Sequence, residues 1–347
     1  MGEKAGLYIH IPFCASKCPY CDFYSVKYDK ESARGYVERI CAEFEKYKGA
    51  EFDTVYLGGG TPSALDSDMI CKIISAAKKS FRISENSEIT IECNPSKDLS
   101  SDFREYKKAG INRVSIGMQS AVKAERLALG RTAGSDKVAK TVEDARTAGI
   151  FNISLDLMIG TPKQTADSLF KTFDFIKQMN VPHISAYMLK IEQGTPFFKL
   201  RDKLALPGDD EVADMYLETV YELKKQGLLQ YEISNFAKPG FESRHNIKYW
   251  NLTPYLGIGK TAHSFWNGRR FYYDRDFNIV DDGAGGTEEE KIMLGMRLSR
   301  GVEKTLIKKD CSAYVKAGLM TQTDSRIAFT PKGFLVSNTI LADIITL

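Results

Sequence analysis

Three cysteines stand close together near the start of the chain, in the segment FCASKCPYCDF (residues 13–23). Cys14, Cys18 and Cys21 follow the spacing Cys-x3-Cys-x2-Cys. Thiolates bind zinc and iron–sulfur clusters, and a structural zinc ion needs a fourth ligand, for which His10 is the nearest candidate. A [4Fe–4S] cluster held by three thiolates keeps one iron open for another ligand. The spacing therefore predicts a metal site and leaves zinc and iron–sulfur chemistry as alternatives.

The other cysteines and the start of the chain bear on the cellular compartment. The chain holds seven cysteines, and we expect Cys41, Cys71, Cys93 and Cys311 to be buried structural residues. An odd number of thiols with one tight cluster favours a reducing compartment. The segment Met1–Gly6 is polar and lacks the apolar stretch of a secretory signal. We therefore expect a cytoplasmic protein.

The composition excludes some classes of function. Lys and Arg number 48 against 45 Asp and Glu, which gives a formal net charge of +3. That balance predicts no nucleic-acid surface. No apolar run approaches the roughly 18 residues of a membrane helix. With 43% hydrophobic and 27% charged residues, the composition is that of a globular protein with a sizeable core.

Short runs rich in β-branched residues alternate with longer amphipathic segments, which predicts an α/β fold with a parallel sheet. The expected strands are Leu7–Ile11, Thr54–Leu57, Ile89–Cys93, Arg113–Met118, Ile153–Ile159 and His183–Leu189. The expected helices are Ser32–Tyr47, Asp66–Lys79, Leu99–Ala109, Ser135–Ala148, Thr165–Met179 and Asp209–Gln226. Three helices are followed by glycine, at Gly110, Gly149 and Gly227, which is a common signal for a helix end.

Polar or glycine-rich residues follow each predicted strand. The cysteine cluster follows the first strand, and GGGTP, ECNP, GMQS, GTP and EQGTP follow the others in turn. An open doubly wound sheet gathers ligands at one switch point, whereas a barrel brings the ends of all its strands to one mouth. Six such loops therefore favour an incomplete barrel. The bare glycines of GGGTP predict close approach of the backbone to a ligand.

These segments resemble the radical S-adenosylmethionine (SAM) superfamily, whose signature is Cys-x3-Cys-x2-Cys with an aromatic residue between the last two cysteines. YIHIPFCASKCPYCDF, YLGGGTPS, IECNP, SIGMQS, LGR and LDLMIGTPKQT follow in order. Together they resemble the branch that contains oxygen-independent coproporphyrinogen oxidase and heme chaperones of the HemW type. The resemblance covers residues 7–196 and resumes near 241–266. It implies a partial (β/α)6 barrel of the radical SAM type.

The resemblance also implies roles for particular residues. Cys14, Cys18 and Cys21 each ligate one iron of a [4Fe–4S] cluster, and the fourth iron chelates SAM. The residues implied for SAM, or for a second SAM or substrate, are Tyr8, Tyr20, Gly60, Thr61, Pro62, Glu92, Gln119, Arg131 and Asp156. A carboxylate at Glu92 suits the two hydroxyls of a ribose. The guanidinium of Arg131 suits a methionyl carboxylate.

Within this branch the sequence is most similar to the heme chaperones. RHNIKYW (244–250) matches their His-Asn-x-x-Tyr-Trp motif, and Phe23 stands where the oxidase has a further cysteine. The resemblance implies a protein that binds a [4Fe–4S] cluster, SAM and heme and transfers heme to an acceptor. An oxygen-independent coproporphyrinogen III oxidase or a related radical SAM transferase is the alternative, so the protein is either an enzyme or a chaperone. We expect His245 to contact heme, because histidine is a common axial ligand; His183 and His263 are weaker candidates.

The implied partners are heme, an unknown heme-acceptor protein and an electron donor such as flavodoxin or ferredoxin. A membrane-associated acceptor and a homodimer are both compatible with the resemblance. Three regions are expected along the chain. Residues 1–227 form the partial barrel, residues 228–286 connect and carry the HNxxYW motif, and residues 287–347 form a small α+β domain that resembles a winged helix. The hairpin of that domain is expected to turn near Asp324–Ser325, and DDGAGG (281–286) is the best candidate for a linker.

Overall fold

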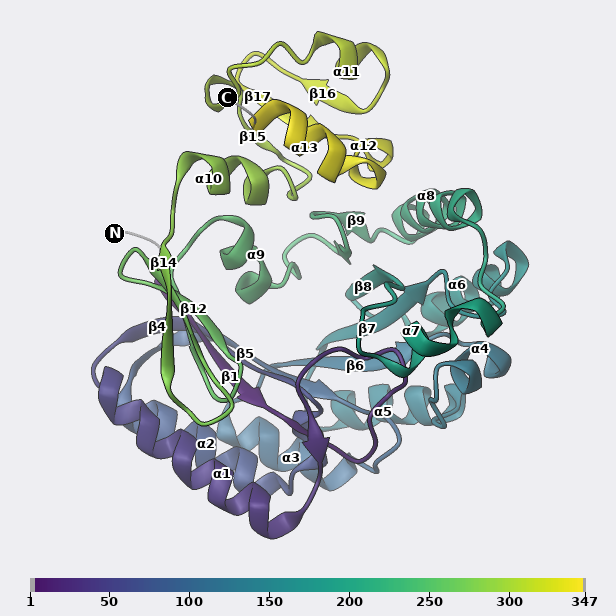
Figure 1. Ribbon diagram of the computed structural model, residues 1–347. Helices are drawn as coiled ribbons and strands as arrows, with labels where there is room; N and C mark the ends of the chain where they lie inside the picture. The colour runs from purple at the N-terminus through teal and green to yellow at the C-terminus, as the bar shows by residue number, and fades with distance from the viewer. Residues whose placement is uncertain (1–3, 346–347) are drawn as a thin grey trace.

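The protein is built around a long curved sheet (Figure 1). The structure, a computed structural model, describes residues 4–345. Within that range the main sheet has twelve strands in the order β14-β13-β12-β11-β1-β4-β5-β6-β7-β8-β10-β9. Its parallel centre consists of β1 (Ala5–Ile11), β4 (Glu51–Gly59), β5 (Arg82–Cys93), β6 (Arg113–Gln119), β7 (Asn152–Ile159) and β8 (His183–Met188). All six predicted strands are confirmed, and the sheet stays open as an incomplete barrel.

Helices connect these strands and cover the outer face of the curved sheet (Figure 1). They are α1 (Lys30–Glu43) with η1 (Phe44–Tyr47), α2 (Ser67–Ser80), α3 (Ser100–Ala109), α5 (Ser135–Thr147), α6 (Ala166–Met179) and α8 (Asp209–Lys225). The three glycines expected at helix ends all have positive φ, for example 104° at Gly110. Four short helices were not predicted because they lie within loops: η2 (Pro62–Ala64), α4 (Lys123–Ala128), α7 (Pro196–Leu200) and η3 (Arg201–Lys203).

The two faces of the central strands carry different residues. Residues such as Val55, Ile91, Ile116 and Leu155 alternate along the strands, are fully buried and pack in the core beneath the helices. The inner face instead carries polar residues at the intervening positions. They include Tyr8, Tyr56, Thr90, Glu92, Arg113, Ser115, Ser154, Asp156, His183 and Ser185. A parallel sheet covered on both faces usually has near-continuous apolar strands. The alternation therefore marks an inner face that is built to hold polar groups.

Residues 228–286 extend both edges of the sheet, which was not predicted. β10 (Asn235–Ala237) and β9 (Leu229–Gln230) follow β8 in antiparallel pairing. On the other edge β11 (Tyr255–Ile258) pairs parallel with β1, and β12 (His263–Trp266), β13 (Arg269–Tyr273) and β14 (Ile279–Ala284) continue antiparallel. The predicted linker was wrong for residues 281–284, because they pair with β13.

Helix α9 (Arg244–Trp250) connects the two edges and lies against the first half of β1 and β4 (Figure 1). The backbone N–H groups of Arg244 and His245 donate to the carboxylate of Glu88 at 3.1 Å each. The largely buried Lys248 reaches Asp53 at 2.8 Å. Because these contacts join α9 to β4 and β5, the helix closes the inner face at the amino-terminal ends of the strands.

The last part of the chain forms a small unit beside α9 (Figure 1). Its elements are α10 (Glu288–Gly295), β15 (Val302–Glu303), η4 (Lys304–Leu306), α11 (Ser312–Lys316), β16 (Met320–Gln322), β17 (Arg326–Phe329), α12 (Pro331–Leu335) and α13 (Ser337–Ile345). The three strands form an antiparallel sheet in the order β15-β17-β16. The hairpin turns between Gln322 and Arg326, as predicted. No helix within residues 4–345 is long and apolar enough to cross a bilayer.

The close approach of β11 and β12 gives a test of the extended edge. A Cβ atom added at Gly257 would lie 2.1 Å from the carbonyl oxygen of His263, whereas one added at Gly35, on the exposed side of α1, would meet nothing within 4 Å. We expect Gly257→Ala to lower the free energy of unfolding by about 1–3 kcal/mol through overpacking. The matched change Gly35→Ala should raise it by about 0.5–1 kcal/mol, because alanine favours a helix. Urea unfolding followed by circular dichroism measures both, and equal stability of the two variants would contradict the strand pairing.

Candidate functional site

A cavity of about 430 Å³ lies at the inner face and the carboxyl ends of the central strands. The thiols of Cys14, Cys18 and Cys21 line it together with seven other residues predicted for the site. These are Tyr20, Gly60, Thr61, Glu92, Gln119, Arg131 and Asp156. The structure therefore brings residues from five different strand ends to one place, as a barrel mouth would.

The cysteines lie on a loop that is held by backbone hydrogen bonds. β2 (Phe13–Cys14) pairs with β3 (Val26–Lys27), and the Tyr28 N–H donates to the carbonyl of Cys14 at 2.8 Å. All three thiols are half-buried. Burial raises the pKa of the Cys21 thiol, and the nearby Cys18 and Cys14 thiols add to the rise. The three thiols therefore influence one another across one wall of the cavity.

The fit of this wall to a metal can be judged from the donor set. Within residues 4–345 no group of three or more His, Cys, Asp or Glu side chains already converges on a single ion position. His10, the expected fourth zinc ligand, is buried, and its nitrogens are hydrogen-bonded with the Tyr8 hydroxyl at 3.0 Å and the Tyr24 carbonyl at 3.3 Å. Burial lowers the pKa of His10 to about 4. Three thiols without a fourth ligand fit an iron–sulfur cluster with one open iron better than a tetrahedral zinc ion.

The glycine turn after β4 touches both the cysteine loop and the inner face. The N–H groups of Gly60 and Thr61 donate to the carbonyls of Ile11 and Phe13 at 2.9 and 2.8 Å. The Thr61 hydroxyl lies 3.5 Å from the Cys14 sulfur. Gly59 has a φ of 115°, which favours glycine, and its N–H donates to Glu92 at 3.1 Å. The backbone of this turn is thus shared between the two halves of the site.

Glu92 is the best-anchored carboxylate in the cavity. The Tyr56 hydroxyl donates to one of its oxygens at 2.9 Å, and the Gly59 N–H donates to the other. Gly58 leaves room for this group, because a Cβ there would lie 3.0 Å from Glu92. Burial, followed by the neighbouring Asp156, raises the pKa of Glu92 to about 7. A fixed carboxylate that ionises near neutral pH can accept hydrogen bonds from a diol.

Asp156 and Arg131, which also line the cavity, are held by different partners. The Ser115 hydroxyl donates to Asp156 at 2.8 Å, and burial raises the pKa of Asp156. The Nε of Arg131 donates to the Tyr20 hydroxyl at 3.2 Å. Gly117 leaves room for Gln119, since a Cβ there would lie 3.1 Å from the side-chain nitrogen of that residue. The cavity is therefore lined by both cationic and anionic groups.

Several cavity residues were missed in the sequence. They are Tyr56, Asn94, Arg113, Ser115, Met158, Ser185, Tyr187 and Asn246, with Phe23 and Lys190 among others at the rim. Arg113 and Ser115 on β6, and Ser185 and Tyr187 on β8, are each two residues apart, so both members of each pair face the inner side of the sheet. The signal that could have found them is the alternation of polar and apolar residues within otherwise buried strands.

Three predicted site residues do not line the cavity. Pro62 is buried in η2, and Tyr8 packs between His10 and Tyr56. The prediction that His245 contacts heme is not supported: the ring is 1% exposed, and its nitrogens are hydrogen-bonded with Thr54 at 2.8 Å and Tyr249 at 2.9 Å. Burial lowers its pKa to about 3. Stacked on Tyr56, His245 supports the residue that holds Glu92.

The two other histidines named as heme candidates differ in exposure. His183 is fully buried and hydrogen-bonded with Ser154 and Tyr231. His263 is exposed at the start of β12 and stacks on Tyr272, with ring centroids 5.0 Å apart. Of the two, the ring of His263 is the one that a ligand in solution can reach.

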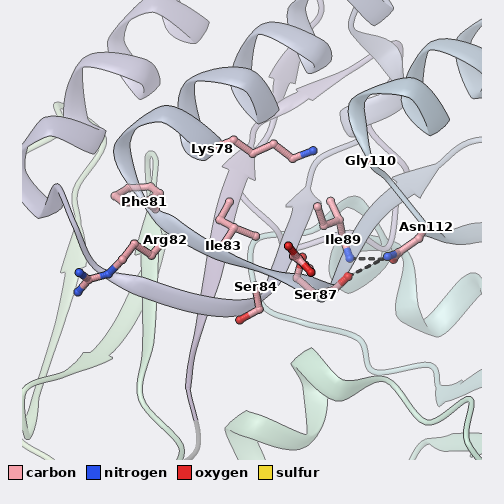
Figure 2. Close-up of a pocket in the computed structure, with 10 residues that line it drawn as sticks. Lys78, Phe81, Arg82, Ile83, Ser84, Ser87, Ile89, Gly110 and Asn112 are labelled. Carbon is pink, nitrogen blue, oxygen red and sulfur yellow. Dashed lines mark hydrogen bonds between the residues drawn. The ribbon is translucent and has the colours of Figure 1, made fainter.

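A second cavity, of about 540 Å³, lies near the amino-terminal half of β5 (Figure 2). Its polar groups are engaged with the protein. Lys78 donates to the carbonyl of Ala109 at 2.6 Å, and the Asn112 side chain bonds the backbone of Ile89 and Ser87 at 2.9 and 2.8 Å. None of the predicted site residues lines it. This cavity is a packing feature of the strand and carries no chemistry of the predicted kind.

Comparison with known proteins agrees with this geometry. Residues 8–176 match the radical SAM superfamily. The chain is 33% identical over 361 residues to the heme chaperone HemW of Lactococcus lactis, with 96% of this chain and 95% of that protein covered. It is 33% identical over 368 residues to the heme chaperone HemW of Bacillus subtilis, with 96% and 97% covered. The coproporphyrinogen III oxidase HemN of Escherichia coli, a radical SAM enzyme, shares the fold, with a TM-score of 0.82 at 20% identity over 99% of this chain and 91% of that chain. The chain therefore belongs to the HemW family of the radical SAM superfamily.

Proposed function

We propose that this protein binds a [4Fe–4S] cluster, SAM and heme, and transfers heme to an acceptor protein. One observation supports this most strongly: in a chain similar to heme chaperones along nearly its whole length, three thiols and seven of the nine residues expected around SAM line a single cavity. A cluster and SAM bound together supply one-electron cleavage of the sulfonium, with electrons from a flavodoxin- or ferredoxin-type donor.

Within this proposal different groups of residues bind different ligands. Cys14, Cys18 and Cys21 hold the cluster. Gly60 and Glu92 hold the nucleoside part of SAM, because Gly60 lines the cavity without a side chain and Glu92 offers a fixed carboxylate. Thr61, Gln119, Arg131 and Asp156, together with Tyr20, line the part of the cavity that would hold a second SAM or the substrate.

The alternative function is that of a coproporphyrinogen oxidase. Phe23 argues against it, because this residue is 64% exposed on the cavity rim, at the position where the oxidase carries a further cysteine. Anaerobic incubation with coproporphyrinogen III, SAM and a reductant separates the two. A chaperone leaves the propionates intact, whereas formation of protoporphyrinogen would establish the oxidase.

Cluster binding is tested by Cys18→Ser, with Cys71→Ser as the control. Cys71 lies on α2, outside the cavity, and its thiol only faces the carbonyl of Glu105. After anaerobic reconstitution we expect about four iron and four sulfide per chain in the wild type and in Cys71→Ser, and a near-complete loss in Cys18→Ser, because two thiolates do not hold the cube. Iron and sulfide analysis measures this. Zinc in place of iron, or full iron in Cys18→Ser, would contradict the assignment.

The role of Glu92 predicts a pH dependence of SAM binding. With a pKa of about 7, Glu92 is mostly protonated at pH 6 and mostly ionised at pH 8. Because the carboxylate accepts from both ribose hydroxyls, we expect the affinity for SAM to rise roughly fivefold to tenfold between these pH values. Calorimetry on the reconstituted protein measures it. In Glu92→Gln the affinity should be lower and flat with pH; an equally steep profile in that variant would place the titrating group elsewhere.

Heme binding is tested with the exposed histidine. Titration of the protein with hemin, followed by the Soret band, should show an affinity that falls about tenfold or more in His263→Ala, since an axial ligand is lost. His245→Gln is the matched control, because the buried ring of His245 has both nitrogens engaged. A loss confined to His245→Gln would reverse this assignment.

A further inference from the structure

Arg113 is a buried charge at the inner end of the cavity. It is the first residue of β6, it is 1% exposed, and it is among the largest fully buried side chains. On the inner face it lies level with Thr90 of β5 and Asn152 of β7, one step before Glu92 and Ser115. It nevertheless lines the cavity. The guanidinium therefore faces the space that a ligand would fill, from its deepest end.

This guanidinium has no partner among residues 4–345. Its Nε is buried without a hydrogen bond, and the side chain makes no hydrogen bond or ion pair with any described residue. Two other arginines with little exposure differ in this respect. Arg131 donates to the Tyr20 hydroxyl, and Arg126 donates to the Ser120 carbonyl and the Ser135 hydroxyl. Burial of an unpaired charge is strongly unfavourable, so such a group indicates a missing partner.

The carboxylates and the histidine of the inner face are hydrogen-bonded with other groups, whereas the Thr90 hydroxyl and the Asn152 side-chain oxygen, level with Arg113, have no partner among the described residues. Both oxygens of Glu92 accept hydrogen bonds from Tyr56 and Gly59. Asp156 accepts from Ser115, and His183 is bonded with Ser154 and Tyr231. Arg113 favours the ionised forms of Glu92 and Asp156 through space, but neither carboxylate lies within ion-pair distance of it. The charge of Arg113 is thus partly compensated by the two carboxylates, while the N–H groups of its guanidinium have no hydrogen-bond acceptor within the described part of the chain.

We propose that Arg113 binds a carboxylate of the ligand that enters the cavity most deeply. A guanidinium offers two parallel N–H groups, which fit the two oxygens of a carboxylate. This inference rests on the proposed function, whose ligands supply that group in two ways: SAM through its methionyl tail, and heme through its propionates. Arg131 differs from Arg113 because its Nε already donates to the Tyr20 hydroxyl.

Matched ligands with and without the carboxylate test this inference on the reconstituted protein. SAM is compared with decarboxylated SAM, and hemin with hemin dimethyl ester, in the wild type, Arg113→Gln and Arg113→Lys. If Arg113 binds the carboxylate, the wild type binds the ligand with the carboxylate more tightly than the analogue without it. In Arg113→Gln we expect the ratio of these two affinities to fall roughly 10- to 100-fold for one of the two ligand pairs. The pair that changes identifies the source. Arg113→Lys, which keeps the charge without the two parallel donors, gives the same comparison with a smaller change should Arg113→Gln not fold.

The possible failures are distinguishable. Unchanged ratios for both ligand pairs in the Arg113 variants would overturn this inference and leave the proposed function intact. The inference would also be overturned if the wild type bound each acid and its carboxylate-free analogue equally well. A wild type that binds neither SAM nor hemin would overturn both. Arg131→Gln is the control for the position of the guanidinium. We expect it to affect a different ligand pair from the one that Arg113→Gln affects.

Discussion

Burial of charge on one face of a parallel sheet is the constraint on which this structure depends. The outer face is apolar and covered by helices, while the inner face places the half-buried Glu92 and Asp156 and the buried Arg113 around one cavity. Such groups are costly unless hydrogen bonds and opposite charges surround them. The hydroxyls of Tyr56 and Ser115 and the Gly59 N–H provide that support for the two carboxylates. Helix α9 completes the enclosure at the amino-terminal ends of the strands.

The glycine turn after β4 couples the position of the cysteine loop to that of Glu92 on the inner face. Its backbone is bonded to the carbonyls of Ile11 and Phe13, which lead into the cysteine loop, and also to Glu92 on the inner face. A change in the position of Cys14 is therefore transmitted through Thr61 to the group that holds Glu92. A ligand bridging the thiols and Glu92 would find both ends set by one segment, which reduces the loss of conformational freedom on binding.

The sequence predicted the parts of the fold that local periodicity specifies. Six strands and six helices have a clear periodicity of apolar residues. The cysteine loop can likewise be recognised from the spacing of its cysteines alone. The edge strands β9–β14 were missed because they are short and the central strands beside which they lie, β1 and β8, are far away in the chain. The burial of His245 was not predicted for a related reason: a motif gives residue type and spacing, but the packing of α9 decides that its ring turns inward to Thr54 and Tyr56. Arg113 was overlooked because a charge at the start of a strand usually faces solvent, and only the curvature of the sheet encloses it.

The pairing of β1 with β11 has a consequence for how the chain is made. Gly6–Ile9 lie beside Tyr255–Ile258, so a segment that leaves the ribosome first gains its second neighbour only when most of the polypeptide has been synthesised. At the usual speed of translation this delay is roughly 10 to 50 seconds, during which one edge of β1 is unpaired. The nascent protein therefore spends that interval with its cysteine loop already exposed next to an incomplete sheet, a stage at which protection by chaperones would matter most.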